Sequence, residues 1–219
     1  MTGTSKKITY RGEETVYDLT INGTVTLHAI DNGAFGLMAK GDLTVGASKT
    51  LSSTSSENII ITEHANTAIT IGTPATGIAG LYSLRFRQSG SLNLPACTTP
   101  RVLLETGTGN IVVATGDLTV TTELQVDSGT TFNANGNTIS LFDLDLNTGG
   151  TLNISNSDMI FNVNSSGDDC HLGQGTLITG NCTITGYSSA AKTTLTARSD
   201  ANFEVVGDVK WLDLVNEDG

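Results

Sequence analysis

Apolar residues recur at intervals of twenty residues between positions 84 and 154 of this chain. Leucine marks the first position of the repeat at Leu84, Leu104, Leu124 and Leu144. A second apolar row follows eight residues after each leucine, at Leu92, Val112, Phe132 and Leu152. A fixed period of this length is typical of stacked architectures, in which each unit buries its apolar face only against its two neighbours. The period therefore predicts an elongated stack whose function lies on an extended surface.

The clearest pair of repeats lies sixty residues apart and aligns without a gap. Leu81–Phe86 aligns with Leu141–Leu146, and Gly90–Leu94 aligns with Gly150–Ile154. Leu212-Asp213-Leu214 lies a further sixty residues on, which predicts that it continues the row of Leu92 and Leu152. The phase drifts between residues 45 and 80, so the loops there must differ in length.

Composition favours β-structure throughout. Short runs of Thr, Val, Ile and Leu are interrupted by Gly and Asn, and no window has the spacing of an amphipathic helix. Twenty residues in three short strands suit one coil of a parallel β-helix. We therefore expect an all-β fold, a right-handed parallel β-helix or solenoid-like stack of roughly 20-residue coils; the alternative is an antiparallel β-sandwich. The expected core comprises Leu84, Phe86, Leu92, Leu94, Phe132, Leu144, Leu146, Leu152 and Ile154.

The chain divides into two expected parts. Residues 1–16 are polar and read as an N-terminal arm or attachment segment, and residues 17–219 form the β-solenoid domain. Within that domain we expect irregular coils at 28–80 and 164–200, where loop-like composition is concentrated. Trp211, the single tryptophan, is expected to cap the last apolar layer of the stack.

Charge and hydropathy exclude two classes of partner. The formal net charge of −11 repels phosphate backbones, so nucleic-acid binding is not expected. No stretch approaches the roughly 18 apolar residues of a membrane span. The opening residues also lack the apolar segment of a secretory signal.

The densest group of potential metal ligands is Asp168-Asp169-Cys170-His171. Successive residues of a strand point to opposite faces, so the four cannot converge on one ion. His28 and His64 are remote in sequence, and we expect no metal or cofactor site. Cys170 could pair with Cys182 across stacked coils, although buried free thiols also fit an odd count of three cysteines.

Carboxylates on one face of a solenoid are the remaining candidates for catalysis. Asp143 and Asp145 share one face of an expected strand, and Glu123 or Asp127 would lie one coil away. The sister repeat carries Arg85 where Asp145 stands, and surface charges on a solenoid usually protect it from association. We therefore expect no catalytic residues and no enzymatic activity.

The segments Gly116–Val120 and Asn22–Thr26 resemble the Thr/Gly/Asn-rich repeats of bacteriophage tail fibres, head fibres and decoration proteins. The resemblance implies a structural or attachment protein of the virion, often a homotrimer, that assembles in the host cytoplasm. Its implied partners are other copies of the chain, other virion proteins and host-surface glycans. Two alternatives remain: a carbohydrate-binding or carbohydrate-cleaving β-helix protein, and a cell-surface adhesin.

Overall fold

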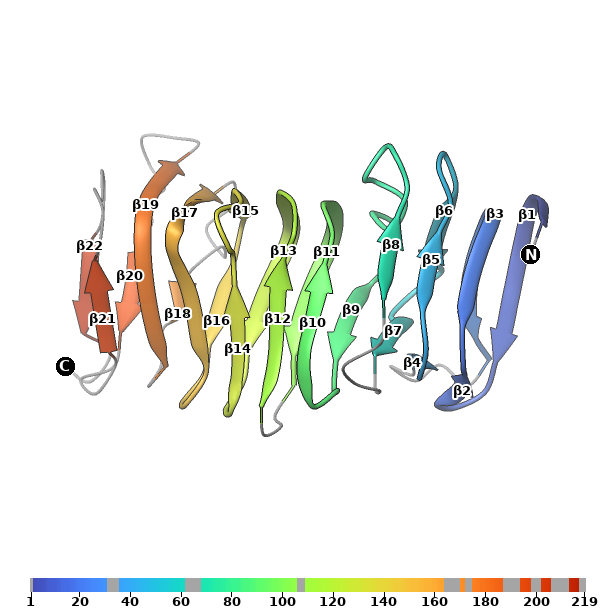
Figure 1. The fold of residues 1–219 in the computed structure, drawn as a ribbon, viewed down its shortest axis with the longest axis horizontal. Coiled ribbons are helices and arrows are strands. Elements are labelled where there is room, and N and C mark those ends of the chain that lie inside the picture. The colour runs from blue at the N-terminus through green and yellow to red at the C-terminus, as the bar shows by residue number, and fades with distance from the viewer. Residues whose placement is uncertain are drawn as a thin grey trace.

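The computed structural model describes residues 2–30, 36–61, 68–105, 109–163, 170–171, 175–186, 194–197, 202–205 and 213–216. Figure 1 shows these residues as strands stacked side by side along one long axis, with β1 at one end and β21 and β22 at the other. Every pairing between the named strands is parallel, and no helix occurs in the described residues. The parallel β-solenoid is confirmed, and the antiparallel sandwich is excluded.

The strands of successive coils form three faces of the stack. The first face contains β2 (Glu14–Val16), β4 (Gly36–Ala39), β7 (Asn58–Ile61), β9 (Ser83–Phe86), the second half of β11 (Cys97–Leu104), the second half of β13 (Leu118–Val126), β16 (Leu144–Leu146), β18 (Cys170–His171), β20 (Thr194–Ala197) and β22 (Asp213–Asn216).

The second and third faces are each built in two sections. The second face contains the first half of β3 (Leu19–Ala29), β5 (Leu43–Val45) and β8 (Ile69–Ile71), and then β10 (Gly90–Leu94), β12 (Asn110–Ala114), β14 (Thr130–Asn133), the first halves of β17 (Thr151–Val163) and β19 (Thr176–Gly186), and β21 (Asn202–Val205). The third face contains β1 (Thr2–Tyr10), the second half of β3 and β6 (Thr50–Ser53), and then the first halves of β11 and β13, β15 (Ile139–Leu141) and the second halves of β17 and β19.

The core runs through the middle of the stack because alternate side chains of each strand point inward. In β3, for example, Ile21, Val25 and Leu27 are fully buried, whereas the alternate residues Asn22, Thr24 and Thr26 are exposed or half-buried. All nine expected core residues lie in this core, each at most 3% exposed. The prediction of the core is therefore confirmed.

The rows of the repeat agree with the prediction at one face and differ at another. Leu92, Val112, Phe132 and Leu152 are successive register partners, as expected. Leu84, in contrast, pairs with Val102 rather than with Leu104, which pairs with Phe86. Because the shift is two residues, Leu104 still points inward, and the period survives in the sequence although the pairing does not follow it.

The first sixteen residues correct the expectation of an arm. β1 pairs with β3, and β2 pairs with β4, so both strands belong to the stack. The reason is apolar content: Tyr10 is buried in the core, and Ile8 and Val16 pack against it. The sparse apolar residues of this segment are spaced so that they face inward.

Three further expectations about the irregular regions have different outcomes. Residues 28–80, where irregular coils were expected, hold the five strands β4, β5, β6, β7 and β8. In 164–200 the structure describes β18, β19 with the preceding Gly175, and β20; the rest of that range, and Trp211, lie outside the described residues. Leu214 pairs with Leu195 on the first face, so it does not continue the row of Leu92 and Leu152.

A short Asp-Leu-Thr motif joins successive coils at their corners. The carboxylate Oδ1 of Asp18 accepts a hydrogen bond from Asp42 N–H, Asp42 Oδ1 accepts one from Ala68 N–H, and Asp117 Oδ1 accepts one from Thr138 N–H, each over 2.8 Å. Asp18 and Asp42 precede strands of the second face, whereas Asp117 precedes a strand of the third face. This difference explains why Gly41–Val45 and Gly116–Val120 resemble each other at an offset outside the twenty-residue period.

Glycines form a row at another corner. Gly109 N–H donates to Gly129 O over 3.3 Å, and Gly129 N–H donates to Gly149 O over 3.0 Å. The φ angles are 79°, 74° and 76°, in the left-handed region that glycine adopts without a steric penalty. The twenty-residue spacing of these glycines therefore reports a repeated turn.

Candidate functional site

The outer surface of the first face carries the densest group of charged side chains, and we call it the charged face. It is defined by Arg85, Arg87, Arg101, Glu105, Glu123, Gln125, Asp127 and Asp145, which lie on or directly after β9, β11, β13 and β16. Leu84 and Phe86 point into the core, so the alternation of the strand directs Arg85 outward. The register then stacks Arg85, Leu103, Gln125 and Asp145 in one row across four coils.

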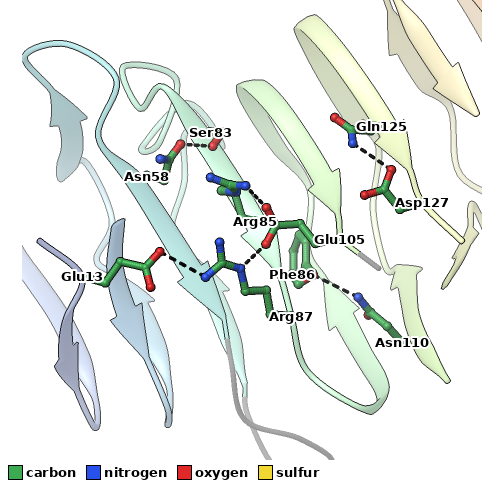
Figure 2. Close-up of polar contacts among 10 residues, drawn as sticks. All are labelled: Glu13, Asn58, Ser83, Arg85, Phe86, Arg87, Glu105, Asn110, Gln125 and Asp127. Carbon is green, nitrogen blue, oxygen red and sulfur yellow. Dashed lines mark hydrogen bonds and ion pairs between the residues drawn. The ribbon is translucent and has the colours of Figure 1, made fainter. Parts of the chain in front are cut away.

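Glu105 is the centre of an ion-pair network on this face. Its Oε1 pairs with Nη2 of Arg85, and its Oε2 pairs with Nε of Arg87 (Figure 2). Arg87 also donates from Nη1 to Oε1 of Glu13 over 3.2 Å, which ties the start of the chain to the fourth strand of this face. Burial lowers the pKa of Arg85, and the neighbouring charge of Arg87 lowers it further. Glu105 therefore relieves the repulsion between two arginines.

Arg101 makes a second group of contacts. Its guanidinium lies 4.8 Å from the centre of the Tyr82 ring, and its Nη1 donates to the Tyr82 hydroxyl over 2.9 Å. The same Nη1 lies 3.6 Å from Oε2 of Glu123, its register partner one coil on. Burial raises the pKa of Glu123, Arg101 opposes this, and the carboxylates of Asp145 and Asp127 add to the rise.

The structure brings together three of the four expected carboxylates. Asp145 and Asp127 both act electrostatically on Glu123, so the three share the charged face. Asp143 precedes β16 and joins the coils through its backbone, because its carbonyl accepts a hydrogen bond from Leu124 N–H over 2.9 Å. Asp127 Oδ1 accepts hydrogen bonds from Gln125 Nε2 and from Asn147 Nδ2, both over 2.8 Å.

These contacts define what the charged face can do chemically. A carboxyl with a raised pKa, such as Glu123, has the property of a general acid, and a second carboxyl group beside it, from Asp127 or Asp145, is what a base or nucleophile would require. Against this role, the carboxylates of Glu105, Glu123 and Asp127 each have a cation or amide partner in the structure. The partners of Glu105, Glu123 and Asp127 include residues one coil away, so the contacts join coils across the face.

The expected metal cluster is only partly described. Cys170 and His171 form β18 on the first face, whereas Asp168 and Asp169 lie outside the described residues. Cys182 pairs in register with Met159 on the third face, so Cys170 and Cys182 belong to strands of different faces and are not stacked. Within the described part of the chain, no group of three His, Cys, Asp or Glu residues could hold a metal ion. Cys97 is a buried free thiol, and burial raises its pKa to about 12.

The sequence analysis missed a buried carboxylate, Glu57, which is 2% exposed. Its Oε1 accepts hydrogen bonds from Ala29 N–H over 3.0 Å and from the Thr54 hydroxyl over 2.8 Å, and its Oε2 accepts one from Ser55 N–H over 2.6 Å. Burial alone would raise the pKa of Glu57, but these donors outweigh it and the pKa is lowered. The one signal in the sequence was a glutamate at the end of the Ser/Thr-rich segment 48–57.

Buried amide side chains were missed as well. The Ser83 hydroxyl donates to Oδ1 of Asn58, its register partner one coil earlier (Figure 2). Asn110 is fully buried; its Oδ1 accepts a hydrogen bond from Gln88 Nε2 over 2.7 Å, and its Nδ2 donates to Phe86 O over 3.1 Å. These bonds satisfy polar groups inside the stack and fix the alignment of adjacent coils.

Two findings bear on the class of the protein. In the described ranges there is no helix of the length and hydropathy needed to cross a membrane. Comparison with protein-family models, with curated proteins and with solved structures finds no match to this chain.

Proposed function

We propose that the chain is a non-enzymatic structural protein of a virus particle, either a tail fibre, a head fibre or a capsid decoration protein. The observation that carries the proposal is that side chains of the charged face form contacts between neighbouring coils. The ion pairs of Glu105 with Arg85 and of Glu123 with Arg101, and the bond of Asp127 with Asn147, all run between coils. Polar groups used in this way support a long, stiff stack.

The sequence repeats add the second support, because Gly116–Val120 and Asn22–Thr26 resemble the Thr/Gly/Asn-rich repeats of phage fibre and decoration proteins. Immunogold electron microscopy of purified virus particles, with antibodies raised against the chain, tests the proposal. We expect label at a fibre or on the capsid shell. Absence of the chain from particles, by both labelling and mass spectrometry, would overturn it.

The proposal includes assembly. Such proteins are often homotrimers, so we expect a homo-oligomer, with a trimer favoured, that contacts other virion proteins after assembly in the host cytoplasm. The net charge of −11 disfavours contact between like faces at low salt, so weakly charged faces should form the interface. Light scattering over the micromolar range checks this, and a monomer at every concentration would contradict self-association.

A carbohydrate-cleaving activity is the second candidate, and the raised pKa of Glu123 beside Asp127 and Asp145 is the observation that favours it. Incubation with a panel of polysaccharides, followed by detection of reducing ends and unsaturated products, separates the two functions. Turnover that is abolished by Glu123→Gln or Asp145→Ala would replace the structural proposal.

A further inference from the structure

A polar hollow of about 300 Å³ lies at a corner between the second and third faces, away from the charged face. One coil contributes Asn133, Asn135 and Gly136 to its lining, and the next contributes Asn153, Ser155 and Asn156. Asn133 of β14 and Asn153 of β17 are register partners. Adjacent strands lie about 4.8 Å apart, so two carboxamides are stacked in one row.

The backbone around the hollow is held in place by hydrogen bonds. Asn133 Oδ1 accepts one from Asn135 N–H over 3.0 Å, and Asn153 Oδ1 accepts one from Ser155 N–H over 3.1 Å. Gly136 N–H donates to the Ser157 hydroxyl over 2.9 Å. Asn135 and Gly136 have φ angles of 52° and 82°, and an Asn-Gly pair tolerates this left-handed conformation. A ligand here would meet a preformed surface and would lose little free energy to ordering it.

The same bonds leave donors free. The carboxamide oxygens of Asn133 and Asn153 are turned toward the backbone, so each Nδ2 lies on the opposite side of its carboxamide. Neither Nδ2 has a hydrogen-bond partner among the described residues, and the exposed side chain of Asn156 has none there either. Both half-buried carboxamides therefore present two N–H donors each, next to the amide of Asn156 and the hydroxyl of Ser155.

The lining determines the chemical class of the ligand. It contains no charged side chain, whereas anions are bound by Arg or Lys and Ca²⁺ requires several oxygen ligands that usually include carboxylates. The chain's net charge of −11 further disfavours anions. A neutral molecule that both accepts and donates hydrogen bonds matches amide and hydroxyl groups, and the adjacent hydroxyl groups of a sugar do both.

We infer that this hollow binds neutral carbohydrate. Sugar hydroxyl oxygens accept hydrogen bonds from Nδ2 of Asn133 and of Asn153, and their protons are donated to the amide oxygen of Asn156 or to the Ser155 hydroxyl. The lining has no aromatic ring for stacking, so one site binds weakly, and several copies in an assembly bind more tightly through avidity. The inference goes beyond a structural role, because it gives the solenoid a contact with glycans.

Nuclear magnetic resonance of the full ¹⁵N-labelled chain tests the inference directly. The probes are methyl glycosides of glucose, galactose, mannose and N-acetylglucosamine, with glucuronic acid and calcium chloride as charged comparators. We expect saturable shifts of the side-chain amide signals of Asn133 and Asn153 with at least one neutral glycoside, and none with the comparators. No saturation with any neutral glycoside, or shifts produced by calcium instead, would overturn the inference.

Substitutions then separate recognition from folding. Asn133→Asp and Asn153→Asp keep the oxygen that accepts the backbone hydrogen bond but remove the Nδ2 donors, and we expect at least tenfold weaker binding. Asn156→Ala serves as a second variant, because an exposed side chain without protein partners can be removed without unfolding the stack. Asn93→Asp is the matched control, since Asn93 lies two coils earlier in the row of Asn133 and outside the hollow.

Binding that is unchanged in both Asp variants and in Asn156→Ala would contradict the site. The outcome is independent of the virion proposal. A chain that binds sugar through these asparagines but is absent from virus particles would retain this inference and overturn the proposed function.

Discussion

The hydroxyl of Thr54 donates a hydrogen bond to Oε1 of Glu57 over 2.8 Å, and Nδ1 of His28 lies 3.0 Å from the same hydroxyl oxygen. The three side chains form a chain of hydrogen bonds from the half-buried imidazole to a buried carboxylate. Glu57 also accepts from Ala29 N–H, so the chain of bonds fastens the loop after β6 to the end of β3 in the preceding coil.

The protonation of His28 follows from this arrangement. Thr54 has one hydroxyl proton and donates it to Glu57, so Nδ1 of His28 must carry the proton of the remaining hydrogen bond. We expect neutral His28 to be the Nδ1–H tautomer, and ¹⁵N chemical shifts of the ring measure this. Thr54→Val should shift the population toward Nε2–H, whereas Thr54→Ser should not; equal tautomer populations in all three proteins would contradict the assignment.

Substitution of Glu57 should destabilise the stack at neutral pH. Glu57→Gln places an amide group against backbone N–H donors, and we expect the free energy of unfolding to fall by about 1 to 3 kcal/mol. The pKa of Glu57 is lowered from 4.5, so its contribution is present above that pH and is lost as the pH falls through the folded-state value.

Urea unfolding at pH 7 and at pH 3 checks both statements. The difference in the free energy of unfolding between Glu57→Gln and the parent chain should be smaller at pH 3 than at pH 7. Glu14→Gln is the control, because Glu14 is exposed on β2. Equal losses from the two substitutions would show that Glu57 has no special role.

Tyr10 should make the fold sensitive to alkali. Burial, and then the charge of Glu57, raises the pKa of Tyr10 from 10.0 to about 12. The raised pKa means that neutral Tyr10 stabilises the folded protein below pH 10, and this contribution to the free energy of unfolding is lost as the pH rises through about 12. We expect Tyr10→Phe to unfold at higher pH than the parent chain, as followed by circular dichroism; an unchanged alkaline midpoint would contradict the raised pKa.

Glu105 should be the most important charge of the charged face. Glu105→Gln removes the carboxylate that both Arg85 and Arg87 contact, although Arg87 keeps its ion pair with Glu13, and we expect the free energy of unfolding to fall by about 1 to 3 kcal/mol. The loss should shrink in high salt, because salt screens the repulsion between the arginines. Asp158→Asn, at an exposed position of β17, is the control in the same unfolding measurement.

Cys97 should be unreactive in the folded protein. Its pKa of about 12 leaves almost no thiolate at pH 8, and the side chain is 2% exposed. In a chain with Cys170→Ser and Cys182→Ser, a thiol reagent should report no free thiol until denaturant is added. Rapid labelling at pH 8 without denaturant would contradict burial of the thiol.

The sequence predicted the fold and much of the core because alternation and period are local properties. The row from Leu92 to Leu152 could be predicted because those coils have equal length. Pairing of Leu84 with Val102 could not, because this coil has 18 residues and the next, from Val102 to Leu124, has 22. The two deviations cancel, so the sixty-residue alignment looked regular.

The polar contacts were much less predictable. Glu13 and Arg87 are 74 residues apart, and nothing near either residue in the sequence indicates the other. Glu57 depends on donors from two separate segments, and its burial is a consequence of how the coils stack. By contrast, Glu123, Asp127 and Asp145 were placed on one face correctly, because strand alternation and coil length together determine that position.

Coil length also varies without disturbing the pairing that follows. Phe86 pairs with Leu104, and Gly90 pairs with Asn110. Gly90 follows Phe86 by four positions, whereas Asn110 follows Leu104 by six. The additional residues fall between Leu104 and Asn110, outside both pairings. A peptide inserted between these two strands should therefore lengthen one coil and leave its neighbours in register, which makes the solenoid a scaffold that accepts new sequences along its edge.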